Sequence, residues 1–299
     1  MPDDGGSTAA TPVTLPGASQ FDFASRISGR TYRIFVSRPL APPPACGYPV
    51  VFVTDANLSF PIAATQGGAM AFAGKGLLVV GVGYPNDDNP AAPWMLRLRD
   101  LSPPTPLSRI KRTPGQPPPA AETYGGSQLF FRFLTEELRP AIHRLHPIDA
   151  QRQTLYGHSL GGLFALEALF KHPGTFQTYV ASSPSIWWNG RALLRREAGF
   201  ARQVAAGRIA PRVLITMGAL EQTPEEKPPP GMTMTMTQYR KLLRDSRMVD
   251  NARELAARLA RLEGARPYLV RYVEFADEGH MSVVPASLGR ALTFAMEDS

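Results

Sequence analysis

One short segment, GHSLG at residues 157–161, restricts the possible folds of this chain more than any other part of the sequence. It matches the pattern G-x-S-x-G, which is only suggestive by itself. An apolar stretch over residues 154–156 precedes it, and an apolar stretch compatible with a helix follows at residues 163–170. A strand, a sharp turn and a helix in this order are typical of a nucleophile elbow, which exposes its serine at the end of a strand. The flanking glycines let strand and helix approach closely, as an elbow requires. We therefore predict that Ser159 is a nucleophile exposed by such an elbow.

Apolar stretches of strand length alternate with helical stretches along most of the chain. Two segments of alternating polarity, residues 20–27 and 30–38, are typical of an antiparallel hairpin at a sheet edge. This order predicts an α/β fold with a mostly parallel central sheet, helices on both faces and an N-terminal antiparallel hairpin. Together with the predicted elbow, it indicates the α/β-hydrolase type. The strands are expected at residues 48–54, 77–84, 153–156, 178–181, 212–217 and 268–275, and the helices at 127–145 (with a kink or break at Pro140), 160–171, 191–206, 248–262 and 285–296.

The chain is predicted to hold a single domain. With 299 residues and 43% hydrophobic composition it can bury one large core. Residues 1–19 are expected to form a disordered tail, which leaves residues 20–299 for the domain. Two stretches lack periodicity, residues 85–126, with ten prolines and five Lys or Arg residues, and residues 223–237. Both follow predicted strands, at the sheet edge where α/β folds bind ligands, so we expect them to form walls or lids of a cleft.

Composition argues against several function classes. The single cysteine, Cys46, allows no internal disulfide, and the five histidines lack metal-ligand spacing, so no metal or other cofactor is expected. The net charge of +7 favours anionic partners, but no basic block with interleaved aromatic residues indicates nucleic-acid binding. No segment has the length and hydropathy of a membrane span, and residues 1–16 lack the apolar core of a signal peptide. We expect a soluble protein, with cytoplasm and periplasm both left open.

A serine hydroxyl becomes a nucleophile when a neighbouring base takes its proton. In this fold the nucleophile, the acid and the histidine follow one another along the chain, and only His172 and His280 lie after Ser159. His172 is expected at the far end of the helix that follows the serine, where its charge offsets the helix dipole. His280 follows the last predicted strand and is therefore the predicted base. The loop after residues 212–217 offers Glu221 as the acid that would orient the imidazole.

Alternatives to Glu221 stay open at this point. The competing interpretation of Glu221 is an ordinary solvated loop carboxylate. Asp250 lies within a charged helical stretch, which is more typical of a surface position. A Ser–His dyad assisted by a backbone carbonyl would need no carboxylate.

Two backbone N–H groups are predicted to hold the oxyanion. One belongs to Leu160, the residue after the nucleophile, at the N-terminus of the predicted helix. The other belongs to the loop after residues 48–54, where we favour Asn57. In the same loop, Asp55 is expected to hydrogen-bond neighbouring amides and so brace the backbone.

The chain resembles a family of esterases that includes the siderophore trilactone esterases acting on enterobactin, salmochelin and bacillibactin. The similarity extends over roughly residues 30–296. It is strongest in residues 125–188 and in the segment 279–285, with the motifs GHSLGG (157–162), SPSIWW (183–188) and GHMSVVP (279–285). Residues 97–103, RLRDLSP, also resemble an R-x-x-D-x-[ST]-P segment of these proteins. The resemblance implies an α/β-hydrolase with a Ser/His pair and a third carboxylate that some members lack.

The resemblance also implies a substrate, a siderophore-type trilactone or related ester. Such a small molecule is anionic as a ferric catecholate, and arginine and aromatic side chains would suit it. Arg97, Arg99 and Trp187 are the candidate contacts, although arginines can also cover a loop and tryptophans can pack beneath an elbow. Two departures concern the substrate side: Ala56, where relatives commonly read Gly after Asp, and the high proline content of residues 85–126.

Other functions fit the same residues. A carbohydrate or small-acyl esterase, or an acyltransferase in which an alcohol replaces water, would use the same nucleophile and base. A siderophore-binding module without catalysis could be built on the same fold, since fold alone does not define function. An intact pair of Ser159 and His280 argues against the binding module.

Overall fold

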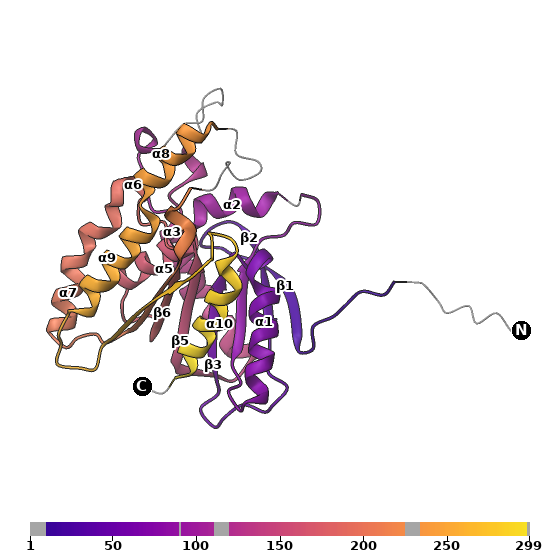
Figure 1. The fold of residues 1–299 in the computed structure, drawn as a ribbon. Coiled ribbons are helices and arrows are strands. Elements are labelled where there is room, and N and C mark those ends of the chain that lie inside the picture. Colours follow the sequence, from indigo (N-terminus) through magenta and orange to yellow (C-terminus); the bar gives the residue numbers. More distant parts are fainter. Residues whose placement is uncertain (1–9, 90, 111–119, 225–233, 298–299) are drawn as a thin grey trace, which may run out of the picture.

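A computed structural model of the chain describes residues 10–89, 91–110, 120–224 and 234–297. Within these residues, strands form one eight-stranded sheet in the order β1-β2-β4-β3-β5-β6-β7-β8 (Figure 1). The strands are β1 (Ala18–Ala24), β2 (Thr31–Ser37), β3 (Tyr48–Thr54), β4 (Leu78–Gly83), β5 (Ile148–His158), β6 (Thr178–Ser182), β7 (Arg212–Gly218) and β8 (Leu269–Phe275). β1 begins at Ala18, two positions before the predicted start of the domain.

The strand directions confirm the predicted sheet. β1 and β2 pair antiparallel with each other, β2 pairs antiparallel with β4, and all the other neighbours are parallel. The chain runs from β3 outward to β4 and then returns to β5 on the other side of β3. The loops after β3 and β5 therefore diverge, and α/β sheets bind ligands in the crevice that such a reversal leaves at the carboxyl edge.

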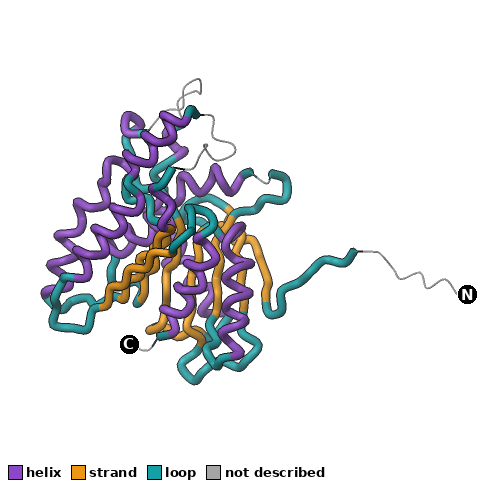
Figure 2. The backbone as a smooth tube through the Cα atoms, viewed as in Figure 1, coloured by secondary structure: helices purple, strands orange, loops and turns teal. Residues whose placement is uncertain are grey.

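Helices cover both faces of the sheet, which explains why β3 and β4 are apolar and buried throughout (Figure 2). On one face, α1 (Ala56–Phe72) and α10 (Val283–Met296) lie side by side and share an apolar cluster with the sheet. The other face packs against α3 (Ser127–Arg132), α4 (Arg139–Leu145), α5 (Leu160–Lys171), α7 (Glu197–Ala205) and α9 (Met248–Ala260). No helix within the described ranges has the length and hydropathy needed to cross a lipid bilayer.

The helix predicted at residues 127–145 is interrupted near Pro140, as expected. Between α3 and α4 the backbone forms a π-helical stretch, η3 (Phe133–Leu138), and Pro140 lies in the first turn of α4. Proline cannot donate to the carbonyl four residues earlier, and its ring crowds that carbonyl. A wider π turn at this point relieves both problems without ending the helical run.

The stretch at residues 85–126 is more regular than its sequence indicated. It contains a ten-residue helix, α2 (Ala92–Leu101), and the short turns η1 (Leu107–Arg109) and η2 (Ala121–Thr123). In Figure 1, α2 lies above the edge at which the parallel strands end, together with α8 (Met236–Ser246). Residues 90 and 111–119 fall outside the described ranges, as do residues 225–233 of the second stretch, so the predicted lids are described only in part.

Candidate active site

The backbone turns sharply at Ser159, between the end of β5 and the start of α5. Its φ of 61° and ψ of −116° are unusual for a residue with a side chain. Hydrogen bonds hold this conformation on both sides: the Ser159 N–H donates to the Ser182 carbonyl at 2.9 Å, and its own carbonyl accepts from Leu163 at 3.0 Å. Strain of this kind is found at nucleophile elbows, so the predicted elbow is present.

The glycines around the serine are required by close packing of the backbone. A Cβ at Gly157 would lie 2.1 Å from the carbonyl oxygen of Gly161. A Cβ at Gly161 would in turn lie 2.4 Å from the Thr54 hydroxyl oxygen at the end of β3. Hydrogen side chains at these two positions let β5, α5 and the loop after β3 meet at one point. That point carries Ser159.

Replacing Gly157 by alanine should therefore destabilise the fold by about 3 kcal/mol or more, because backbone atoms would have to move. Gly68, an exposed residue in α1 with no atom within 4 Å of its Cβ position, offers a matched control. Gly68→Ala should stabilise the chain by about 0.5–1 kcal/mol through a lower entropy of the unfolded state. Thermal and urea unfolding measure both. Equal unfolding temperatures for the two variants would contradict the packing argument.

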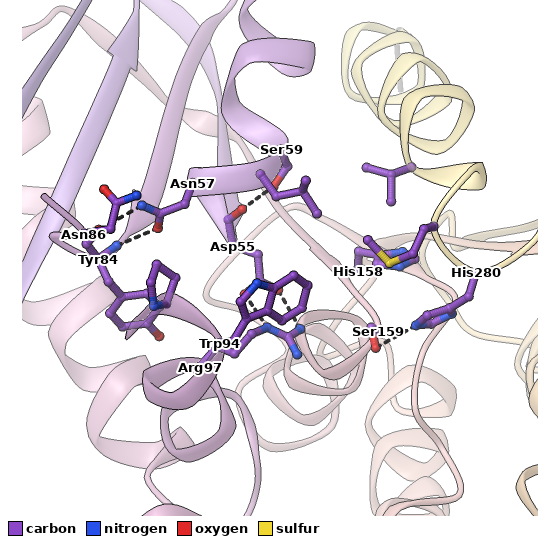
Figure 3. A pocket seen from close by; sticks show the side chains of 14 residues that line it. Asp55, Asn57, Ser59, Tyr84, Asn86, Trp94, Arg97, His158, Ser159 and His280 are labelled. Carbon is purple, nitrogen blue, oxygen red and sulfur yellow. Dashed lines mark hydrogen bonds and ion pairs between the residues drawn. The ribbon is translucent and has the colours of Figure 1, made fainter. Parts of the chain in front are cut away.

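A hydrogen-bonded chain links Ser159, His280 and Glu221 (Figure 3 shows its first bond). The Nε2 atom of His280 lies 3.0 Å from the Ser159 Oγ, and its Nδ1 atom lies 2.6 Å from the Glu221 Oε2. The side chain of His280 is 39% exposed, whereas that of Glu221 is 1% exposed. The histidine is thus accessible from the cleft, and the carboxylate that faces it is shielded from water.

The surroundings of Glu221 hold it in one orientation. Its Oε1 atom accepts hydrogen bonds from the Gly218 N–H at 2.8 Å and from the Ser183 hydroxyl at 2.5 Å. Asp250 instead accepts a hydrogen bond from Gln222 at 2.8 Å, which lowers the pKa of Asp250, and pairs with Arg247. The structure therefore brings Glu221 to the histidine and directs Asp250 elsewhere.

The serine and the histidine open into a pocket of about 280 Å³. The helices α1, α2 and α10 and the loops after β3, β4 and β8 form its wall. Apolar and aromatic side chains make up much of it: Leu58, Tyr84, Pro93, Trp94, Met281 and Val284. The buried His158 ring lies 4.7 Å from the ring of His280. Burial is the main reason why the pKa of His158 lies well below its usual value, and the nearby His280 and Arg97 lower this pKa further. His158 is therefore neutral near pH 7.

The predicted oxyanion donors begin helices that meet at this pocket. Leu160 is the first residue of α5, and Asn57 is the second of α1, so neither N–H has an acceptor within its helix. The Asn57 side chain points away from Ser159, because it exchanges two hydrogen bonds of 2.8 Å with the backbone of Tyr84. These bonds tie the start of α1 to the end of β4. The oxyanion role of both N–H groups stays a prediction.

The three predicted substrate contacts differ in their positions. Arg97 lines the pocket, but its guanidinium pairs with Asp55. Arg99 and Trp187 are half-buried and, in the part of the chain that the structure describes, do not line this pocket. The Trp187 ring packs at a tilt against the ring of Trp188, whose indole N–H donates to the Thr105 hydroxyl. Contact of Arg99 and Trp187 with a substrate stays a prediction.

The hydrogen-bond partners predicted for the Asp55 side chain, the neighbouring backbone amides, were wrong. Asp55 precedes α1 with a left-handed backbone, φ 55° and ψ 39°, and its side chain makes no capping hydrogen bond. The carboxylate instead accepts two hydrogen bonds from Arg97, at 2.7 and 2.8 Å. An ion pair with two parallel hydrogen bonds is stronger than a bond to a neutral amide, so the guanidinium outcompetes the neighbouring N–H groups.

Sequence reasoning also missed two residues of the site. Ser183, which donates to Glu221, has a φ of 44° and is completely buried at the end of β6. His158, beside His280, is the variable residue in front of the nucleophile. Both lie within motifs that were singled out, but nothing in the motifs indicated what their side chains would contact. Across the described residues, no three His, Cys, Asp or Glu side chains gather as metal ligands would.

The sheet, the strained serine and the chain of hydrogen bonds behind it define an α/β-hydrolase fold. A family model described as "Putative esterase" matches residues 25–252, and the chain belongs to this esterase family. The resemblance inferred from the motifs is thereby confirmed.

Relatives that match over nearly the whole length carry more specific names. The chain is 39% identical to the ferri-bacillibactin esterase of Bacillus subtilis over 305 residues, which cover 98% of this chain and 93% of the relative. It is 33% identical to the siderophore triacetylfusarinine C esterase of Aspergillus fumigatus, with 96% of each chain covered. Among solved structures, the siderophore hydrolase EstB of Aspergillus nidulans superposes with a TM-score of 0.80 at 32% identity, covering 97% of this chain and 98% of that one.

Proposed function

We propose that this chain is a serine esterase that hydrolyses siderophore trilactones or closely related esters through an acyl-enzyme intermediate. The observation that carries the proposal is the hydrogen-bonded series Ser159–His280–Glu221, whose first two residues line a pocket. The names of the full-length relatives supply the substrate class.

The proposed reaction begins when Ser159 attacks an ester carbonyl while its proton passes to the Nε2 atom of His280. The Glu221 carboxylate keeps the other ring proton on Nδ1 and stabilises the imidazolium. Negative charge develops on the carbonyl oxygen, where the N–H groups of Leu160 and Asn57 would donate. The imidazolium then protonates the leaving alcohol. Water, deprotonated by the same histidine, releases the acid and restores the serine.

The pocket suits an ester with a large apolar or aromatic surface. Leu58, Trp94 and Met281 are all at least 44% exposed, although they line the pocket, so apolar area is left for a ligand to cover. Exposed apolar side chains gathered around a few polar groups are characteristic of small-molecule sites.

Attraction of an anionic substrate would come from the wider surface and not from within the pocket. The charged pair that lines it, Asp55 and Arg97, is mutually neutralised. The chain as a whole carries a net charge of +7. Attraction between exposed charges is screened beyond about 8 Å at physiological ionic strength. We therefore expect charge to act on the encounter with the substrate, and salt to weaken it.

A two-substrate comparison tests the proposal. A catecholate cyclic triester, free and as its ferric complex, is compared with a neutral aryl acetate, and the products are separated by chromatography. We expect kcat/KM for the ferric triester to exceed that for the aryl ester by at least about tenfold, a difference of ~1.4 kcal/mol in transition-state binding. Rising salt should lower kcat/KM for the ferric triester and leave that for the neutral ester unchanged.

Other outcomes favour the rival functions. Tight binding of the triester without cleavage would indicate a siderophore-binding module. Transfer of the acyl group to an added alcohol in preference to water would indicate an acyltransferase. Faster cleavage of the aryl acetate than of the triester would indicate a small-acyl esterase. Equal salt curves for the two substrates would mean that the net charge does not serve binding.

A further inference from the structure

The loop after β3 brings a negative charge to the first turn of α5. The Asp55 Oδ2 atom lies 3.3 Å from the Cβ position of Gly161, two residues after the nucleophile. The helix α1 begins directly after Asp55, and Asn57, Leu58 and Ser59 in its first turn line the pocket. A carboxylate at this position is unfavourable for the proposed reaction, because a second negative charge develops on the substrate's carbonyl oxygen close by.

Arg97 of α2 cancels this charge. Its Nε and Nη2 atoms donate to the two Asp55 oxygens at 2.7 and 2.8 Å, as Figure 3 shows. The side chains are only 11% and 15% exposed, so water screens the pair weakly. Trp94 lies over the guanidinium, 5.7 Å from ring centre to Cζ, and shields it further.

The same helix is tied to the pocket a second time. Asp100, one turn after Arg97, is buried and accepts a hydrogen bond of 3.2 Å from the hydroxyl of Tyr84, a pocket residue. The Ser102 hydroxyl, directly after α2, accepts a hydrogen bond of 3.0 Å from the Gly125 N–H and so fixes the end of residues 97–103. The R-x-x-D-x-[ST]-P segment thus holds α2 against the edge of the sheet. In this arrangement the guanidinium has little freedom to leave Asp55 for a substrate.

We propose that Arg97 is a positioning residue that neutralises Asp55 beside the oxyanion site, and that it is not a binding group for the substrate. The inference rests on the proposed esterase function. Its distinguishing consequence is an asymmetry within one ion pair. Loss of the cation leaves an uncompensated carboxylate next to the developing oxyanion, whereas loss of the carboxylate does not.

Three variants measure this asymmetry on the neutral aryl ester. Arg97→Gln should lower kcat by about tenfold to a hundredfold, with KM changed by less than about threefold. Asp55→Asn should keep kcat within about threefold of wild type, because asparagine tolerates the left-handed backbone at least as well as aspartate. The double variant Asp55→Asn/Arg97→Gln should recover most of the kcat that Arg97→Gln loses.

A matched control removes a different arginine from an ion pair. Arg132 pairs with Glu136 on the surface of the helical segment α3–η3, and Arg132→Gln should leave kcat and KM unchanged. Should Arg97→Gln fail to fold, the double variant and Arg97→Lys still decide the matter, since both leave no unpaired buried carboxylate and should keep kcat within about fivefold.

Two results would overturn the inference. A rise in KM for the ferric triester, with kcat on the neutral ester unchanged in Arg97→Gln, would make Arg97 a substrate contact. A double variant as slow as Arg97→Gln would mean that the pair matters for shape and not for charge. Neither result bears on the proposed function itself, which is tested separately by the two-substrate comparison and by the dependence of the reaction on Ser159.

Discussion

Replacing Ser159 by alanine should lower kcat for ester hydrolysis by about a thousandfold or more, with little change in folding or in substrate affinity. The Oγ atom is the group that His280 contacts at 3.0 Å, and alanine has no atom to take its place. The remaining rate would come from substrate binding and from the oxyanion donors alone. Initial rates on the triester and on the aryl ester measure the loss, and equilibrium binding to the variant measures affinity.

Covalent labelling gives a second reading of the same variant. An organophosphate that reacts with activated serines should add one adduct to the wild-type chain, and Ser159→Ala should stay unmodified under the same conditions. Ser28→Ala, in the distant turn between β1 and β2, serves as the control and should behave as wild type. A Ser159→Ala variant with more than about a tenth of the wild-type kcat, a loss below ~1.4 kcal/mol, is incompatible with the proposed mechanism.

The proximity of Ser159 and His280 could be predicted because signals in the sequence indicate where each residue lies. Ser159 lies in a pattern in which the order strand, glycine, serine, glycine and helix allows few conformations. His280 followed by elimination and from its position after the last strand, and Glu221 from its position after β7. Each prediction needed only the chain order of the elements, and parallel strands bring the residues after them to one edge.

Two other side-chain interactions of the site could not be predicted, because neither the motifs nor the order of the elements indicates their partners. The Asp55–Arg97 pair joins residues 42 positions apart, and Ser183 and Glu221 are separated by 38. The helix α2 was missed because the prolines around it obscured its period. Pro93 is in its first turn, where the missing N–H has no intrahelical acceptor to lose. Composition therefore suggested irregular structure where a proline is compatible with a helix.

Replacing His280 by alanine should cost as much kcat as the loss of the nucleophile, about a thousandfold or more. Glu221→Gln should lower kcat by a similar factor, about a thousandfold to ten-thousandfold, for a reason visible in the hydrogen bonds. The Oε1 atom accepts from both Gly218 and Ser183, so the oxygen of a glutamine would take that position. Its NH2 group would then face the Nδ1 atom of His280.

That contact would force the histidine into the wrong tautomer. Facing an NH2 donor, Nδ1 has to accept, and the ring proton moves to Nε2, the atom that must receive the proton of Ser159. Asp250→Asn is the matched control, since Asp250 bonds Gln222 and not the histidine, and it should change kcat by less than about twofold. A crippling effect of Asp250→Asn with a silent Glu221→Gln would reassign the acid. If both were silent, catalysis would depend on Ser159 and His280 alone.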